Sequence, residues 1–157
     1  FATQADKENF PNVARLLRAI ASAEYVHAGD HYRVLRHLNG GRVATSAGTF
    51  GPGKTAANLE LAIMGESFEV NEMYPAYMEV ARLQEEKNAL RSFEWSYETE
   101  KEHLKLFRKA KDSVDQGEDV DLGPVQVCEV CGYTLEGDAP DLCPLCKAKK
   151  DKFRQFA

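Results

Sequence analysis

Apolar residues recur at helical spacing over most of the first 114 positions of the chain. Between Pro11 and about Leu38 the periodic positions are Val13, Leu16, Leu17, Ile20 and Ala23. Because residues three and four apart share one face of a helix, this pattern predicts a long helix with one buried side. It also predicts a helix end at 1–8 and long helices at about 55–83 and 88–114.

Breaks in the pattern separate these helices. An Asn-Gly-Gly run at 39–41 ends the second helix, and residues 40–53 form a loop long enough to cross between distant helix ends. Thr55 is placed to cap the next helix, and Pro75 should kink that helix or remove one hydrogen bond. A break at 84–87 precedes the last helix. The pattern therefore predicts a mainly α fold of bundled helices.

Two Glu-x-x-His pairs stand at equivalent places in the two halves of the chain. Glu24-x-x-His27 and Glu100-x-x-His103 align when one half is shifted by 76 positions. Helical bundles hold two metal ions with such a pair from each of two helices and a Glu from each of the other two. A single pair is a weak signal, since Glu and His are common on solvated helix faces. The repeated pairs predict a two-metal site.

Glu66 and Glu69 lie on the helix between the two pairs and are candidates for further ligands. A carboxylate on a core-facing stripe costs roughly several kcal/mol unless it is paired or bound to metal. Carboxylates and imidazoles together suit iron or manganese, and carboxylates can change how they bind when a metal changes oxidation state. Such a site favours reduction of O₂ or peroxide. Tyr74 is a candidate donor of a proton or hydrogen bond to peroxide.

All four cysteines lie in the last thirty positions, as two C-x-x-C pairs separated by eleven residues. This crowding is typical of thiolate metal ligation rather than of a disulfide framework. Two such knuckles that face each other close a tetrahedral site of four sulfurs. Spacing does not separate a structural zinc ribbon from an iron centre. Beside a redox bundle an iron that carries one electron has a clear purpose, so we expect iron at Cys128, Cys131, Cys143 and Cys146.

The composition narrows the possible partners and compartment. The chain has 157 residues, enough for one core and a small appendage, and a net charge of −5, which does not favour a nucleic-acid partner. No apolar run approaches the roughly 20 residues needed to cross a bilayer, and no signal-peptide pattern is seen, although the chain begins with Phe1. We expect a cytoplasmic protein with no membrane and no nucleic-acid partner.

The motifs resemble those of the rubrerythrins, in which a ferritin-like di-iron domain precedes a rubredoxin-like iron domain. The resemblance covers nearly the whole chain and is carried by segments 23–27, 65–75, 100–103, 128–133 and 143–146. It implies a ferritin-like four-helix bundle with its first helix largely absent. It places the bundle domain at 1–117, a linker at 118–126 and the rubredoxin-like domain at 127–157.

The resemblance also implies cofactors and site residues. The di-iron centre, oxo-bridged when oxidised, would be held by Glu24, His27, Glu66, Glu69, Glu100 and His103. The four cysteines would hold a mononuclear iron, and zinc or manganese could substitute for iron. Glu69 and Tyr74 are the expected catalytic residues, with Glu69 changing coordination between oxidation states.

The activity that the resemblance implies is reduction of hydrogen peroxide to water in oxidative-stress defence. Electrons would come from a rubredoxin or an NAD(P)H-dependent reductase and pass through the four-cysteine iron. In that scheme they commonly reach the di-iron site of a neighbouring subunit, in a homodimer whose helices can be swapped. The alternatives are an iron-storage or metal-buffering protein and an electron-transfer or zinc-ribbon protein without peroxidase activity.

Two departures from the family pattern stand out. The first helix, with its Gly-Glu-Ser carboxylate, is missing except for its end, so one iron ligand has no counterpart among these residues. Lys147 follows the last cysteine where rubredoxins usually have glycine. We expect this lysine to strain the second knuckle or shift its potential without abolishing metal binding.

Overall fold

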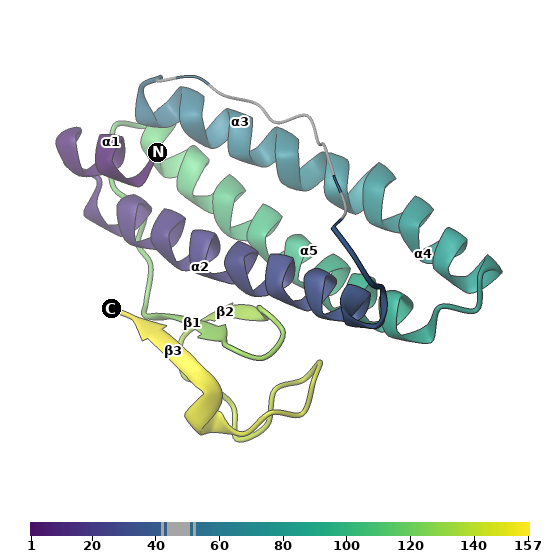
Figure 1. Ribbon diagram of the computed structural model, residues 1–157. Coiled ribbons are helices and arrows are strands. Elements are labelled where there is room, and N and C mark those ends of the chain that lie inside the picture. The colour runs from purple at the N-terminus through teal and green to yellow at the C-terminus, as the bar shows by residue number, and fades with distance from the viewer. Residues whose placement is uncertain (42, 44–50, 52) are drawn as a thin grey trace.

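The structure is a computed structural model that describes residues 1–41, 43, 51 and 53–157. Long helices lie side by side, and a small sheet packs against them from one side (Figure 1). The helical elements are α1 (Ala2–Lys7), α2 (Pro11–Val34), η1 (Leu35–His37), α3 (Thr55–Phe68), η2 (Glu69–Met73), α4 (Tyr74–Leu83), α5 (Lys87–Asp115) and η3 (Lys150–Lys152). The predicted mainly α fold is confirmed. The predicted loop at 40–53 lies largely outside the described residues.

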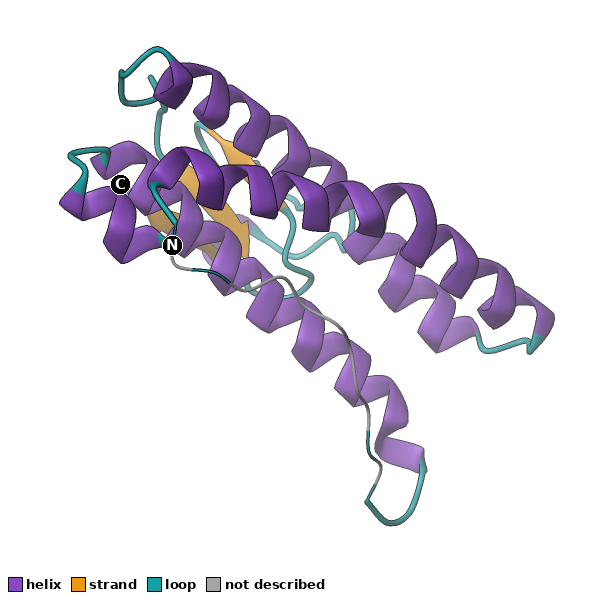
Figure 2. Ribbon diagram, turned by 90° about the horizontal axis from the view of Figure 1, so that it is seen from above, coloured by secondary structure: helices purple, strands orange, loops and turns teal. Residues whose placement is uncertain are grey.

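The helical core follows the predicted periodicity. α2 begins with Pro11, where the missing N–H costs nothing because the first N–H groups of a helix have no partner within it. Val13 and Leu16 are fully buried and Ile20 is 3% exposed. They pack with Leu59 of α3 and with α5 in one hydrophobic core. Seen from above, the helices run alongside one another with the strands behind them (Figure 2).

The α3–α4 rod departs from the prediction at its start, and it changes its helical form at its middle. The Thr55 side chain does not cap α3, so that prediction is wrong; the Thr55 N–H instead donates to Glu8 Oε2, 2.8 Å away. Before Pro75 the helix widens into the π-helical turn η2. Pro75 has no N–H to donate to the carbonyl of the preceding turn, and a wider turn accommodates this loss without ending the rod.

The C-terminal part forms a three-stranded antiparallel sheet. Its strands are β1 (Val125–Cys128), β2 (Thr134–Glu136) and β3 (Phe153–Phe156), in the order β2-β1-β3. Val127 pairs with Thr134 on one side and with Arg154 on the other. β1 is buried along its whole length and contacts α2, so the sheet rests directly on the bundle.

The segment between α5 and β1 is fastened to the first turn of α2. Asp119 accepts hydrogen bonds from the backbone N–H groups of Asn12 (2.8 Å) and Val13 (3.2 Å). The Arg15 guanidinium donates to the carbonyl oxygen of Leu122, 2.6 Å away. Asp119 thus supplies acceptors that the α2 N-terminus lacks. These contacts fix where the sheet sits on the bundle.

The division into domains at 1–117 and 127–157 with a linker at 118–126 stays a prediction. Within the part of the chain that the structure describes, no helix could span a lipid bilayer.

Candidate metal centres

A cluster of carboxylates and imidazoles lies among α2, α3 and α5. One ligand atom from each of Glu24, Glu66, Glu100 and His103 falls within a group whose members are all within 4.8 Å of one another. Glu100 and His103 are fully buried, and Glu66 is 7% exposed. The structure therefore brings together residues that the sequence places up to 79 positions apart.

Glu100 lies between the two histidines of the cluster. Its Oε1 is 2.9 Å from Nδ1 of His27, and its Oε2 is 2.7 Å from Nδ1 of His103. Glu24 Oε1 and Glu66 Oε1 lie 3.2 and 3.6 Å from the same His103 nitrogen. One carboxylate that faces two imidazoles with different oxygens has the donor arrangement of a ligand shared by two metal ions.

The donor atoms of this cluster face one another without good hydrogen-bond geometry. Among the described residues, Glu24 Oε1, both Glu100 oxygens and His103 Nδ1 are buried with no hydrogen-bond partner. Buried polar atoms are almost always paired, so a group of orphans that converge on one place needs an explanation. Cations between these atoms would satisfy all of them at once. The donor set therefore fits a di-iron centre.

The electrostatics of the cluster show the same demand for positive charge. Burial would lower the pKa of His27, but Glu100 and Glu24 beside the ring raise it to about 10. Burial raises the pKa of Glu66 to about 7; the charges of Glu100 and Glu24 also raise it, whereas His103 lowers it. Positive charge beside these carboxylates is therefore favourable, and metal cations would supply it.

Glu69 stands at the edge of this cluster rather than within it. It is half-buried at the start of the π-helical turn, and with Glu24 and Glu66 it lines a groove of about 500 Å³. Burial, reinforced by the charges of Glu100 and Glu24, raises the pKa of Glu69 to about 8. π-helical turns inside α-helices often mark functional sites because they re-aim side chains. Its position suits a side chain that approaches the site from the groove.

Tyr74 is buried next to the cluster and belongs to a polar chain of its own. Its hydroxyl lies 3.2 Å from Nε2 of His31, and His31 Nδ1 lies 2.8 Å from the Ser92 hydroxyl. Burial raises the pKa of Tyr74 well above its ordinary value, with the Glu100 charge acting in the same direction. The phenol therefore holds its proton and is available as a donor.

Thr134 and Gly132 contact the cluster from the C-terminal sheet, and sequence reasoning missed both contacts. Thr134 Oγ1 lies 3.0 Å from His103 Nε2 and donates to the Gly132 carbonyl at 2.9 Å. The hydroxyl oxygen thus accepts a hydrogen bond from the Nε2–H group of His103 and leaves His103 Nδ1 to face the carboxylates. A Cβ on Gly132 would lie 2.3 Å from His27 Nε2. No pattern in the sequence links these positions to the histidines.

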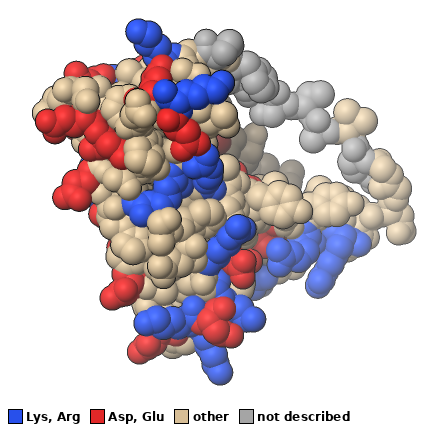
Figure 3. Space-filling view, turned by 90° about the vertical axis from the view of Figure 1, so that its left-hand side faces the viewer, with Lys and Arg blue, Asp and Glu red and all other residues tan. Residues whose placement is uncertain are grey.

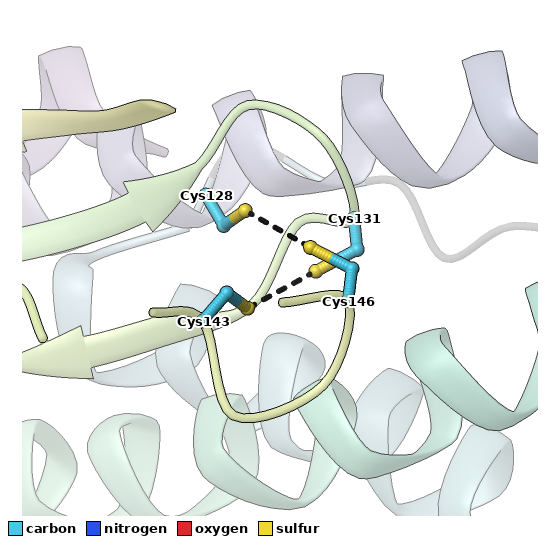
Figure 4. Close-up of side chains that lie close together, drawn as sticks. All are labelled: Cys128, Cys131, Cys143 and Cys146. Carbon is cyan, nitrogen blue, oxygen red and sulfur yellow. Dashed lines mark hydrogen bonds between the residues drawn. The ribbon is translucent and has the colours of Figure 1, made fainter. Parts of the chain in front are cut away.

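The four cysteines form a second, separate cluster (Figure 4). Cys128 Sγ is 3.6 Å from Cys146 Sγ, and Cys131 Sγ is 3.6 Å from Cys143 Sγ. A disulfide needs about 2.05 Å, whereas sulfurs about 2.3 Å from a shared tetrahedral metal would stand about 3.8 Å apart. All four cysteines are free thiols. The spacing fits one metal ion in a four-sulfur site.

The two cysteine knuckles share one backbone design. N–H groups of Val130 and Cys131 donate to the Cys128 sulfur, and those of Leu145 and Cys146 donate to the Cys143 sulfur. Hydrogen bonds from the neighbouring thiols, followed by these N–H groups, lower the pKa of Cys143. The neighbouring thiols and burial raise the pKa of Cys131, so the thiolate character is uneven among the four sulfurs. N–H donors aimed at sulfur are nevertheless the usual support of a metal-bound thiolate.

The residue after each knuckle takes a left-handed backbone conformation, Gly132 with φ of 80° and Lys147 with φ of 63°. Lysine adopts this conformation at a cost of about 1–2 kcal/mol. The predicted departure at Lys147 is thus tolerated by the backbone, and the cysteine geometry is retained.

Comparison with known proteins agrees with both centres. Residues 1–111 match the rubrerythrin family, and residues 126–154 match the family described as rubrerythrin, rubredoxin-like domain. Rubrerythrin-2 of Clostridium acetobutylicum is 42% identical over 153 residues, which cover 98% of this chain and 83% of that protein. Rubrerythrin of Nitratidesulfovibrio vulgaris is 31% identical and covers 98% of this chain and 81% of that protein.

A solved structure extends the likeness to three dimensions. Nigerythrin in its fully reduced, all-ferrous state superposes with a TM-score of 0.85 at 27% identity, covering 99% of this chain and 76% of that one. The carboxylate and histidine cluster fits a di-iron centre, and the four cysteines fit a mononuclear iron site. The chain belongs to the rubrerythrin family.

Proposed function

We propose that this protein is a non-haem di-iron peroxidase that reduces hydrogen peroxide to water in oxidative-stress defence. The observation that carries the proposal is the direct contact between its two candidate metal sites. The first cysteine knuckle rests on His27 through Gly132, and Thr134 hydrogen-bonds His103. A storage protein has no need of a thiolate centre against its carboxylate site, whereas an enzyme that must be re-reduced between turnovers has.

The proposed reaction consumes two electrons and two protons, since hydrogen peroxide is converted to two water molecules. When bound, a pair of iron ions supplies these two electrons to the O–O bond, one from each ion. Glu24, Glu66, Glu100, His27 and His103 would hold the pair. Burial of these side chains keeps bulk water from competing for the same positions.

Glu69 and Tyr74 are the proposed catalytic residues. Glu69 lines the groove that leads to the cluster. From there its carboxylate can move toward the metal site when the charge of that site changes. Tyr74 keeps its hydroxyl proton and contacts His31, so it can offer a hydrogen bond or a proton and be re-protonated through that ring. Peroxide would enter by the groove that Glu24, Glu66 and Glu69 line.

In the proposed electron supply, electrons from outside the protein first reach the four-cysteine iron. Electrons would come ultimately from NAD(P)H through a reductase, or from a rubredoxin. Because the knuckle of one chain lies on the histidines of the same chain, we infer that transfer proceeds within a chain. A homodimer, with or without helix swapping, stays a prediction. We place the protein in the cytoplasm, since four closely spaced free thiols suit a reducing compartment.

Replacement of His27 or Glu100 by Ala tests the proposal. Either change should lower peroxide turnover by about 100-fold or more, because even residues one shell further out cost 10- to 100-fold at metal sites. His37→Ala is the matched control, since His37 is exposed and, among the described residues, bonds the end of its own helix. Turnover that survives both replacements would reject the peroxidase.

Metal analysis separates the rival functions. We expect two irons in the bundle and one in the cysteine site, with iron–thiolate and oxo-bridged di-iron absorption together. Many irons per chain would favour storage, and a colourless protein that contains only zinc would favour a ribbon without redox activity.

A further inference from the structure

The four-cysteine site has an inner side and an outer side. On the inner side Gly132 lies against α2, with no room for a Cβ between Gly132 and His27. Cys128, Cys131 and Cys143 are fully buried, whereas Cys146 is partly exposed. The second knuckle is therefore the edge of the cluster that faces solvent. If electrons leave toward His27, this opposite edge is where they can enter.

Two exposed apolar residues lie beside the exposed edge in the chain. Leu142, directly before Cys143, is 55% exposed, and Pro144 within the knuckle is exposed too. A single exposed leucine is unremarkable on a protein surface. Here it adjoins the thiolate centre, and its backbone is held by a bridge to Lys149.

Basic residues lie next to this edge. Lys147 Nζ donates to the Pro144 carbonyl at 2.8 Å, which places the ammonium group on the knuckle itself. The backbone N–H of Lys150 donates to the Asp141 carbonyl at 3.0 Å, so Lys150 lies beside the same turn. Among the described residues, no carboxylate lies within ion-pair distance of Lys147, Lys149 or Lys150. We call Leu142, Pro144, Cys146, Lys147, Lys149 and Lys150 the outer face.

The charge of this region is opposite to that of the rest of the chain. Residues 138–157 hold five basic and three acidic side chains, whereas residues 1–137 hold 15 basic and 22 acidic ones. Figure 3 shows basic side chains gathered around a few acidic ones at the lower end of the molecule, which the strands and their turns form. A local basic surface on an acidic protein favours acidic partners in one orientation.

We propose that the outer face is the docking surface for a small acidic protein that donates one electron at a time. An apolar centre with a charged rim is the usual anatomy of a protein–protein contact, and electron-transfer encounters use small ones. The step moves one electron from the reduced centre of the donor to the ferric four-cysteine iron, which becomes ferrous, and no proton or bond is exchanged. The inference rests on the proposed function, because it assumes that this iron is a relay.

Charge reversal on the outer face tests the proposal. The variant K149E/K150E is compared with K54E/K87E, which changes the net charge equally at exposed positions at the starts of α3 and α5. The probe is a photoreduced acidic flavodoxin, mixed without oxygen with the oxidised, iron-loaded full chain. Loss of iron–thiolate absorption gives the second-order rate. That absorption before mixing also shows that each variant has folded around its iron.

We expect K149E/K150E to slow the reduction about tenfold at low salt, while K54E/K87E stays within about twofold of the original chain. Added salt should slow the original chain and have less effect on K149E/K150E. Equal slowing in both variants would overturn the proposal, because overall charge would then explain the effect. A changed oligomeric state of K149E/K150E in sedimentation would also overturn it, since the face would then join two copies of the chain.

A second readout separates this inference from the proposed function. Peroxide is added to protein that has been reduced chemically, so that docking is bypassed. K149E/K150E should oxidise at the same rate as the original chain. If the original chain fails to react with peroxide but the flavodoxin rates behave as expected, the peroxidase is rejected and the docking surface stands.

Discussion

The two candidate metal sites of this protein are built in opposite ways. The cysteine site takes all its ligands from one stretch, Cys128 to Cys146, as two similar turns. The carboxylate site gathers its ligands from three helices, from Glu24 to His103. The helices pack around a hydrophobic core that includes no candidate metal ligand, whereas the cysteine turns pack mainly around their own sulfurs. Metal should therefore matter for folding in one region and for chemistry in the other.

Metal removal should give the largest difference between the two regions. The second knuckle depends on few contacts besides its metal, and structural metal sites contribute about 10 kcal/mol to folding. We expect amide protons in its turn, such as that of Lys147, to lose protection after chelation while those of α5 keep theirs. Native-state hydrogen exchange measures both. Equal loss in α5 would show that the bundle also needs its metals to fold.

Gly132→Ala should slow electron transfer between the two sites while both sites keep their metal ions. The added Cβ would fall 2.3 Å from His27 Nε2, and the buried ring has no room to move. A shift of the knuckle should slow peroxide-driven oxidation of the thiolate iron by about 100-fold. Gly137→Ala carries the same left-handed strain with nothing within 4 Å. If both variants transfer electrons equally slowly, backbone strain rather than the contact with His27 is responsible.

Thr134→Val should weaken the carboxylate site from a distance. It removes the oxygen that fixes the ring of His103, and loss of such a partner costs about tenfold or more in metal affinity or activity. Thr99→Val is the control, because Thr99 is equally buried but bonds only a carbonyl of its own helix. Iron titration with turnover measures the effect. Unchanged affinity and turnover in T134V would mean that the bond is incidental.

Tyr74→Phe should have the smallest effect, a loss of about threefold to tenfold in peroxide turnover, the value of one hydrogen bond. The phenol contacts His31 and is not among the clustered ligand atoms. Tyr77→Phe, on the same helix but half-exposed, should leave turnover unchanged. A larger loss in Y74F, comparable to that in E100A, would place Tyr74 among the essential proton donors.

Sequence reasoning succeeded where the physical cause is local. The helical period of α2 and α5 predicted their buried faces, and the cysteine spacing predicted a four-sulfur cluster because each knuckle is one turn. It failed where distant segments meet. Thr55 looked like a cap, but Glu8, which directly follows α1, supplies the acceptor. The contact of Gly132 with His27 depends on how the sheet is placed on the bundle, and no periodicity carries that information.

The residues that follow the two knuckles show the same contrast between local and distant causes. Gly132 and Lys147 share one backbone conformation, which by itself favours glycine at both. At the first knuckle glycine is also required by His27, whereas the Lys147 ammonium group bonds the Pro144 carbonyl of its own turn. Lys147, which replaces the glycine usual in rubredoxins, therefore lies at the knuckle that does not contact His27, where its long cationic side chain meets no such steric limit.

The bonds from Asp119 to the start of α2 have a further consequence. Many redox proteins carry their electron carriers on swinging arms, and their turnover slows when the solvent becomes viscous. Here the connecting segment is held along the bundle, so the proposed relay would operate over a fixed distance. Its speed would then be set by the distance between the two centres and by their driving force, and not by diffusion of one part of the chain toward the other.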